Sequence, residues 1–135
     1  MVKLNTDVMH VLIIADRNTD LDWINNSFTA TGLTVNIINA NAISEATSLI
    51  KSIKFDMVLY DLAFSEECMS ENLKKLTPDL SKAPLIVLTN KQGDPEAREA
   101  LRFGANAHLV KDQLKLTLMA ESFKTILLKD TLNYN

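Results

Sequence analysis

Four polar side chains stand at the ends of short apolar runs in this 135-residue chain, and together they could hold a metal ion and a phosphate. They are Asp16, Asp61, Thr89 and Lys111. Two carboxylates held close together bind a hard cation such as Mg2+ through oxygen. A lysine ammonium can neutralise a phosphoryl group, and a threonine hydroxyl can hydrogen-bond one of its oxygens. One of the carboxylates can also act as a nucleophile, as in enzymes that form an aspartyl-phosphate.

Asp61 is the centre of this set. It directly follows residues 57–60, an apolar run of the length expected for a strand that is buried on both faces. If that strand is parallel and central, Asp61 lies at its carboxyl end, where open α/β sheets bind ligands. An unpaired carboxylate at the edge of a core is costly, so a buried strand does not need an acid there.

Each residue also has a simpler structural explanation when it is taken alone. Asp61 could be a turn or capping aspartate, and Asp16 could cap a helix. Thr89 could be a strand-edge threonine and Lys111 a solvated charge. The four together, at these spacings, favour a shared site.

Strand and helix patterns alternate five times along the chain. Apolar runs predict strands over 8–14, 33–38, 57–60, 84–89 and 108–110. Helical spacing of apolar residues predicts helices over about 20–31, 42–53, 65–76, 95–103 and 113–129. This alternation implies a parallel sheet with right-handed crossovers and helices on both faces. We expect a flavodoxin-like α/β fold with strand order 2-1-3-4-5, in which the first, third, fourth and fifth strands end side by side.

Particular residues mark the predicted helix ends. Trp23 is expected at the margin of the buried face of the first helix, beside Leu21, Ile24 and Phe28. The expected caps are Thr19 or Asp20, Asn41, and Asp94 followed by Pro95. The expected stops are Gly32 and Gly104.

Composition narrows the class of protein. Hydrophobic content of 47% and charged content of 23% are ordinary for one globular domain, expected over 9–128 between a lead-in at 1–8 and a tail or linker at 129–135. The net charge of −3 argues against nucleic acid or anionic membrane as the main partner. The single cysteine, Cys68, excludes an internal disulfide and fits a reducing compartment. With no membrane-spanning run and no signal peptide, we expect a cytoplasmic protein.

From about residue 9 to residue 128, the chain resembles the receiver domain of two-component response regulators. The resemblance rests on the segments 11–16, 56–62, 84–89 and 104–111. It implies a signalling domain whose own chemistry is at most self-catalysed phosphotransfer and autodephosphorylation. The implied partner is a sensor histidine kinase or a phosphotransfer protein. An effector domain in a longer chain and a homodimer are left open.

The resemblance also implies roles for individual residues. Asp61 would accept a phosphoryl group from a kinase phosphohistidine. Mg2+ would be bound by Asp16, by Asp61 and by the backbone carbonyl of Ala63. Thr89 and Lys111 would contact the phosphoryl oxygens, and Thr89 would reorient to signal the modified state. His108 stands at the position of the second switch residue.

Several positions depart from the family's pattern. Receivers usually have two adjacent acids after the first strand, but the first of these is Ala15 here, and Arg17 adds a positive charge nearby that weakens metal binding. The loop after Asp61 usually carries a proline and a glycine, which residues 63–68 lack. His108 replaces the usual Tyr or Phe.

Two alternatives follow from these departures and from the fold. The first is a degenerate receiver that binds a partner without phosphorylation, which Ala15 and Arg17 favour. The second is a flavodoxin-like electron carrier that holds FMN. A flavin phosphate needs a loop rich in Ser, Thr or Gly after the first strand. Residues 15–18 carry an acid and no glycine, which is unfavourable for FMN.

Overall fold

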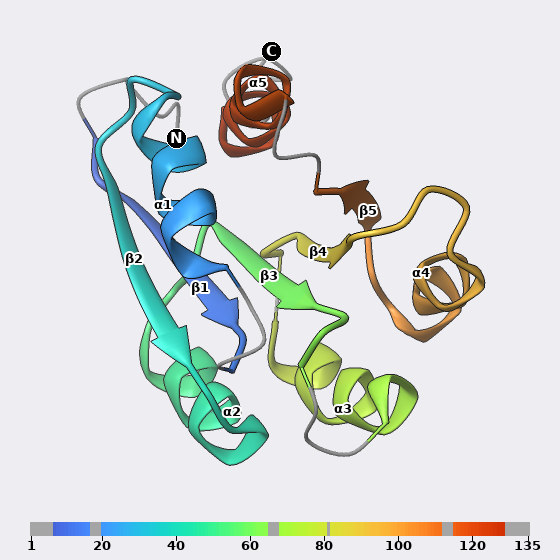
Figure 1. The fold of residues 1–135 in the computed structure, drawn as a ribbon. Helices are drawn as coiled ribbons and strands as arrows, with labels where there is room; N and C mark the ends of the chain where they lie inside the picture. The colour runs from blue at the N-terminus through green and yellow to red at the C-terminus, as the bar shows by residue number, and fades with distance from the viewer. Residues whose placement is uncertain (1–6, 17–19, 65–67, 81, 112–114, 129–135) are drawn as a thin grey trace, which may run out of the picture.

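Parallel strands form one sheet in the computed structural model, which describes residues 7–16, 20–64, 68–80, 82–111 and 115–128. Within these ranges the strands are β1 (Met9–Ile14), β2 (Val35–Ala40), β3 (Met57–Asp61), β4 (Leu85–Thr89) and β5 (Ala107–Val110). Their order is β2-β1-β3-β4-β5 (Figure 1). The predicted flavodoxin-like strand order is therefore confirmed.

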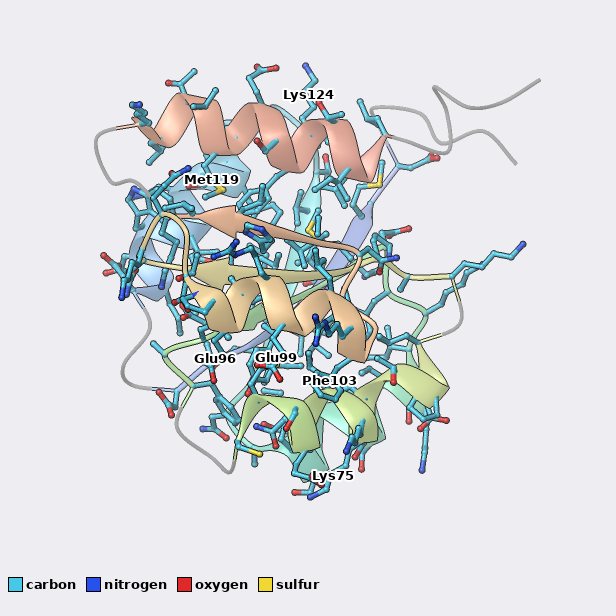
Figure 2. The ribbon with its side chains drawn as sticks, turned by 90° about the vertical axis from the view of Figure 1, so that its right-hand side faces the viewer. Lys75, Glu96, Glu99, Phe103, Met119 and Lys124 are labelled. Carbon is cyan, nitrogen blue, oxygen red and sulfur yellow. The ribbon has the colours of Figure 1, made fainter. Side chains whose placement is uncertain are left out.

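Helices cover both faces of the sheet. They are α1 (Leu21–Thr29), α2 (Ile43–Ser52), α3 (Met69–Leu76), α4 (Pro95–Ala100) and α5 (Leu116–Leu127), with single 3-10 turns over Thr77–Asp79 and Leu101–Phe103. One face carries α1 and α5, and the other carries α2, α3 and α4 (Figure 1). On α5, Met119 points toward the sheet and Lys124 points away from it (Figure 2).

The continuous apolar runs are explained by a core on each face of the sheet. Successive side chains of a strand point to opposite faces, so Leu12 packs into the core beneath α2 and α3 while Ile13 packs into the core beneath α1 and α5. In the second core, the rings of Phe28 and Phe123 stack with centroids 4.2 Å apart, which joins α1 to α5. Strands buried on both faces cannot alternate apolar with polar residues.

Several predicted helix ends are confirmed. Asp20 caps α1, accepting the Trp23 backbone N–H at 3.0 Å, and Asp94 caps α4, accepting the Glu96 N–H at 2.9 Å. Gly104 follows the 3-10 turn after α4 at a φ of 106°. A Cβ built there would lie 2.5 Å from the Thr77 Cγ2 atom, so both backbone conformation and space require glycine.

The second strand and the second helix differ from the prediction. β2 begins at Val35 instead of Leu33, because the Leu33 N–H donates to the Thr31 hydroxyl in the turn and does not join the ladder with β1. Asn41 is not the cap of α2: Ala42 occupies that position without a side-chain cap. The Asn41 N–H instead donates to Glu45, a carboxylate in the first turn, at 3.0 Å.

Trp23 and the last helix also differ. Trp23 is only 8% exposed and belongs to the core between α1 and α5, so its predicted place at the margin of the buried face is wrong. α5 begins at Leu116, later than predicted, and Lys115 gives it no side-chain cap. The alternative cap Thr19, the start of the predicted helix over 65–76 and the whole of the tail at 129–135 lie outside the described residues. No helix in the described ranges has the length and apolar character needed to cross a membrane.

Candidate functional site

The carboxyl ends of β1, β3, β4 and β5 meet at one edge of the sheet. Asp61 is the last residue of β3 and lies opposite Leu88 of β4, and Thr89 lies opposite Val110 of β5. The backbone continues this alignment beyond the strands, because the Lys111 N–H donates to the Thr89 carbonyl at 2.7 Å. Sheet order therefore brings together residues that are far apart in the sequence.

Asp61 is fully buried and is held by two donors. Its Oδ2 atom lies 2.5 Å from the Lys111 ammonium nitrogen, and its Oδ1 atom accepts the Ala63 backbone N–H at 2.8 Å. The side chains of Asp61 and Lys111 are 1% and 6% exposed. A buried carboxylate is tolerated only when it is paired and hydrogen-bonded, and this pair meets both conditions.

Thr89 is directed toward the start of α4. Its hydroxyl donates to the Asp94 Oδ2 atom at 3.0 Å and accepts the Lys91 N–H at 3.2 Å, and the residue is only 2% exposed. The other oxygen of Asp94, Oδ1, caps α4. Sequence reasoning identified Asp94 only as a cap, because its contact with Thr89 depends on the path of the intervening loop.

The pKa of Asp94 lies below its usual value. Burial is the largest single influence and raises the pKa of this carboxyl. Hydrogen bonds from the Glu96 N–H, the Thr89 hydroxyl and the Ala97 N–H, together with the charge of Lys91, outweigh that effect and lower the pKa. Asp94 is therefore ionised at neutral pH and offers Thr89 a charged acceptor.

The predicted metal ligands lie at the ends of neighbouring strands. Asp16 is half-buried two residues beyond Ile14, and Ile14 lies opposite Tyr60, the residue before Asp61. Ala63 follows Asp61 by two residues. Among the described residues no group of three or more His, Cys, Asp and Glu could hold a metal. Two carboxylates and a backbone carbonyl are hard oxygen donors, and they fit an Mg2+ ion that keeps several of its waters.

Of the two residues that depart from the family's pattern after β1, Ala15 and Arg17, the structure describes only Ala15. Ala15 is fully buried and packs in the core between α1 and α5. It has no carboxylate to support the neighbouring Asp16. Arg17 lies outside the described residues.

His108 lies on β5, opposite Val87 of β4. Alternate strand residues share a face, so His108 lies on the same face of the sheet as Val87 and Thr89. The imidazole is half-buried, and its Nδ1 atom is buried without a hydrogen-bond partner. His108 thus shares a face of the sheet with Thr89, but its buried Nδ1 atom makes no hydrogen bond.

A comparison with protein-family models matches residues 11–122 to the response regulator receiver domain. A search of the curated proteins gives no match.

Solved structures of response regulators share the fold. The response regulator RPA3017 in red light signaling of R. palustris is 18% identical, with 94% of this chain and 96% of that chain covered and a TM-score of 0.74. The Mn(2+)-bound form of response regulator Rcp1 is 17% identical, with 90% and 95% covered and a TM-score of 0.71. The phosphorylated cyanobacterial phytochrome response regulator RcpA is 16% identical, with 96% and 97% covered and a TM-score of 0.69.

The buried ion pair predicts a large stability effect. Lys111→Met should lower the free energy of unfolding by about 3–5 kcal/mol, because it leaves a buried carboxylate without its cation. Adding Asp61→Asn should restore most of the loss, since the amide oxygen can still accept the Ala63 N–H. Urea denaturation followed by circular dichroism measures both effects.

The matched control is Lys74→Met. Lys74 pairs with Glu71 at 3.7 Å on the surface, where the side chains are 59% and 55% exposed. Lys74→Met removes this pair and the contact of the Lys74 ammonium with the Phe103 ring at 5.5 Å, which together should cost about 1–2 kcal/mol at most. Equal losses for Lys111→Met and Lys74→Met would contradict the importance given to the buried pair.

Proposed function

The chain belongs to the response regulator receiver domain family, and on that premise we propose that it accepts a phosphoryl group on Asp61. The donor is a phosphohistidine of a sensor histidine kinase or a phosphotransfer protein. The observation that carries the proposal is the Asp61 carboxylate, which is buried at the end of β3 and paired with the Lys111 ammonium. The family is a signalling domain, so the product is a changed binding surface and not a released metabolite.

The transfer step needs a nucleophile and a place for negative charge. An Asp61 carboxylate oxygen attacks phosphorus, a new O–P bond forms, and the N–P bond to the donor histidine breaks with its electron pair going to the imidazole. Catalysis of such transfers is mainly positioning and charge stabilisation. Lys111 supplies a positive charge beside Asp61, and the Ala63 N–H fixes the orientation of the carboxylate.

Burial of Asp61 constrains how the donor reaches it. Because the residue has no accessible surface in this structure, its surroundings must open before phosphorus comes within bonding distance. The Lys111 ammonium sits at the end of a long side chain and can follow a transferred phosphoryl group without leaving the site.

Asp16, Asp61 and the Ala63 carbonyl are the proposed Mg2+ ligands. A bound Mg2+ neutralises charge on the phosphoryl oxygens. The similar Rcp1 structure is a Mn(2+)-bound form and the similar RcpA is phosphorylated, which supports this chemistry for the site. Thr89 and His108 are the proposed switch residues, through which the modified site alters partner or effector binding.

The family match removes the FMN carrier as an explanation of the fold. The degenerate receiver shares the fold and differs only in chemistry. The proposed function requires Mg2+ binding, expected to be weak because of Ala15, whereas the degenerate receiver requires none, so metal binding and phosphorylation must both be measured.

Asp61→Asn should abolish phosphorylation. Wild-type protein incubated with acetyl phosphate and Mg2+ should gain the mass of one phosphoryl group, as measured on the intact protein. Asp79→Asn, which changes an exposed aspartate, should gain the same mass as the wild type. A mass gain that persists in Asp61→Asn would show that another residue is the acceptor.

Ala15→Asp should tighten Mg2+ binding by about tenfold or more, because a supporting carboxylate near a ligand is typically worth 10–100-fold in metal affinity. The new charge enters a fully buried position, so the variant should also lose thermal stability without Mg2+. Titration calorimetry, with the fluorescence of buried Trp23 as a second readout, measures the affinity. Equal affinity in wild type and variant would contradict the role given to the acid pair, and no binding to the wild type would favour the degenerate receiver.

A further inference from the structure

We propose that Asp94 is a positioning residue that holds the Thr89 hydroxyl at the start of α4 and so opposes its engagement with a phosphoryl group on Asp61. This inference rests on the proposed function. It concerns a carboxylate that the sequence pattern marks only as a helix cap. The contacts of Thr89 and Asp94 carry it.

A hydroxyl group has a single hydrogen to donate. Thr89 has one O–H donor, and that donor is directed to Asp94 at 3.0 Å. A phosphoryl oxygen is an acceptor, so Thr89 cannot donate to it while it donates to Asp94. Engagement of the phosphoryl group by this hydroxyl therefore requires the Thr89–Asp94 hydrogen bond to break.

The surroundings strengthen this hydrogen bond. Thr89 is almost fully buried, so water competes little for its hydroxyl. The acceptor is a carboxylate, and hydrogen bonds to charged groups are stronger than those between neutral groups. The Lys91 N–H donates to the Thr89 hydroxyl oxygen at 3.2 Å. This bond occupies a lone pair of the oxygen and favours the rotation of the hydroxyl in which its hydrogen is directed at Asp94.

Asp94 links this bond to α4 because its two oxygens do different work. Oδ1 accepts the Glu96 N–H and caps the helix, while Oδ2 accepts the Thr89 hydroxyl. When Thr89 leaves, the Oδ2 atom loses its donor while the cap can persist. Phosphorylation of Asp61 would thus change the hydrogen bonding at the first turn of α4 through the side chain of Asp94 alone.

An asparagine at position 94 separates the two roles. Its amide oxygen can still cap α4, since Asn is as good a cap as Asp. Its amide nitrogen carries hydrogens and cannot accept the Thr89 O–H. Asp94→Asn therefore weakens the hold on Thr89 and keeps the helix start.

The test uses beryllofluoride with Mg2+ as a phosphoryl mimic, and NMR of the full chain as the readout. Without beryllofluoride, the Thr89 methyl resonance of Asp94→Asn should lie partway toward its position in the beryllofluoride-bound wild type. The apparent affinity for beryllofluoride should rise about tenfold, because a population held back by one charge-assisted hydrogen bond is released. Glu96→Gln, which removes the same charge from an exposed residue on the first turn of α4 (labelled in Figure 2), should stay within about twofold of the wild type.

A second background separates positioning from general stability. In Thr89→Val, which has no hydroxyl for Asp94 to hold, Asp94→Asn should not change the beryllofluoride affinity. An equal gain in both backgrounds, or an Asp94→Asn variant that matches Glu96→Gln, would overturn the inference while phosphorylation of Asp61 still stands. Failure of the wild type to gain a phosphoryl group or to bind beryllofluoride would instead remove the proposed function, and this inference with it.

Discussion

The ion pair between Asp61 and Lys111 is the interaction on which the site depends. A carboxylate with no accessible surface needs a cation within reach, and the cation comes from a residue 50 positions later in the chain. The order β3-β4-β5 places the carboxyl ends of the two segments on either side of β4, at the same edge of the sheet. The fold and the chemistry are therefore connected. The strand order brings the Lys111 ammonium to the buried Asp61 carboxylate, and this carboxylate is the proposed phosphoacceptor.

Much of the fold was predictable because strands buried on both faces have few alternatives. The runs that became β3 and β4 contain almost nothing polar, and parallel strands end at one edge, so the meeting of Asp61, Thr89 and Lys111 followed from strand order alone. The start of the edge strand β2 was harder to predict. Leu33, the first residue of the predicted strand, belongs to the preceding turn, where its N–H donates to the Thr31 hydroxyl. Asn41 was wrongly predicted as the cap of α2. Asparagine is a common capping residue, but its type does not reveal that its own backbone N–H donates to the Glu45 carboxylate.

The contact between Thr89 and Asp94 could not be predicted in the same way. It depends on the conformation of the loop after β4, where Gly93 has a φ of 72° and the Lys91 N–H reaches back to the Thr89 hydroxyl. From the residue types alone, Thr89 was predicted as a threonine at the end of a strand and Asp94 only as a helix cap. Their hydrogen bond lies between the strand that ends beside the proposed phosphorylation site and the first turn of α4, and so gives the proposed switch a physical route through a buried hydroxyl and one carboxylate.

We propose that Asp61, and no other carboxylate at this edge of the sheet, carries the phosphoryl group. The most direct measurement is borohydride reduction of the phosphorylated protein, which converts an aspartyl-phosphate to homoserine, followed by peptide mapping with tandem mass spectrometry. We expect homoserine at position 61 alone. Homoserine at position 16 or 94, or a phosphoryl group on a histidine or serine with Asp61 unchanged, would contradict it.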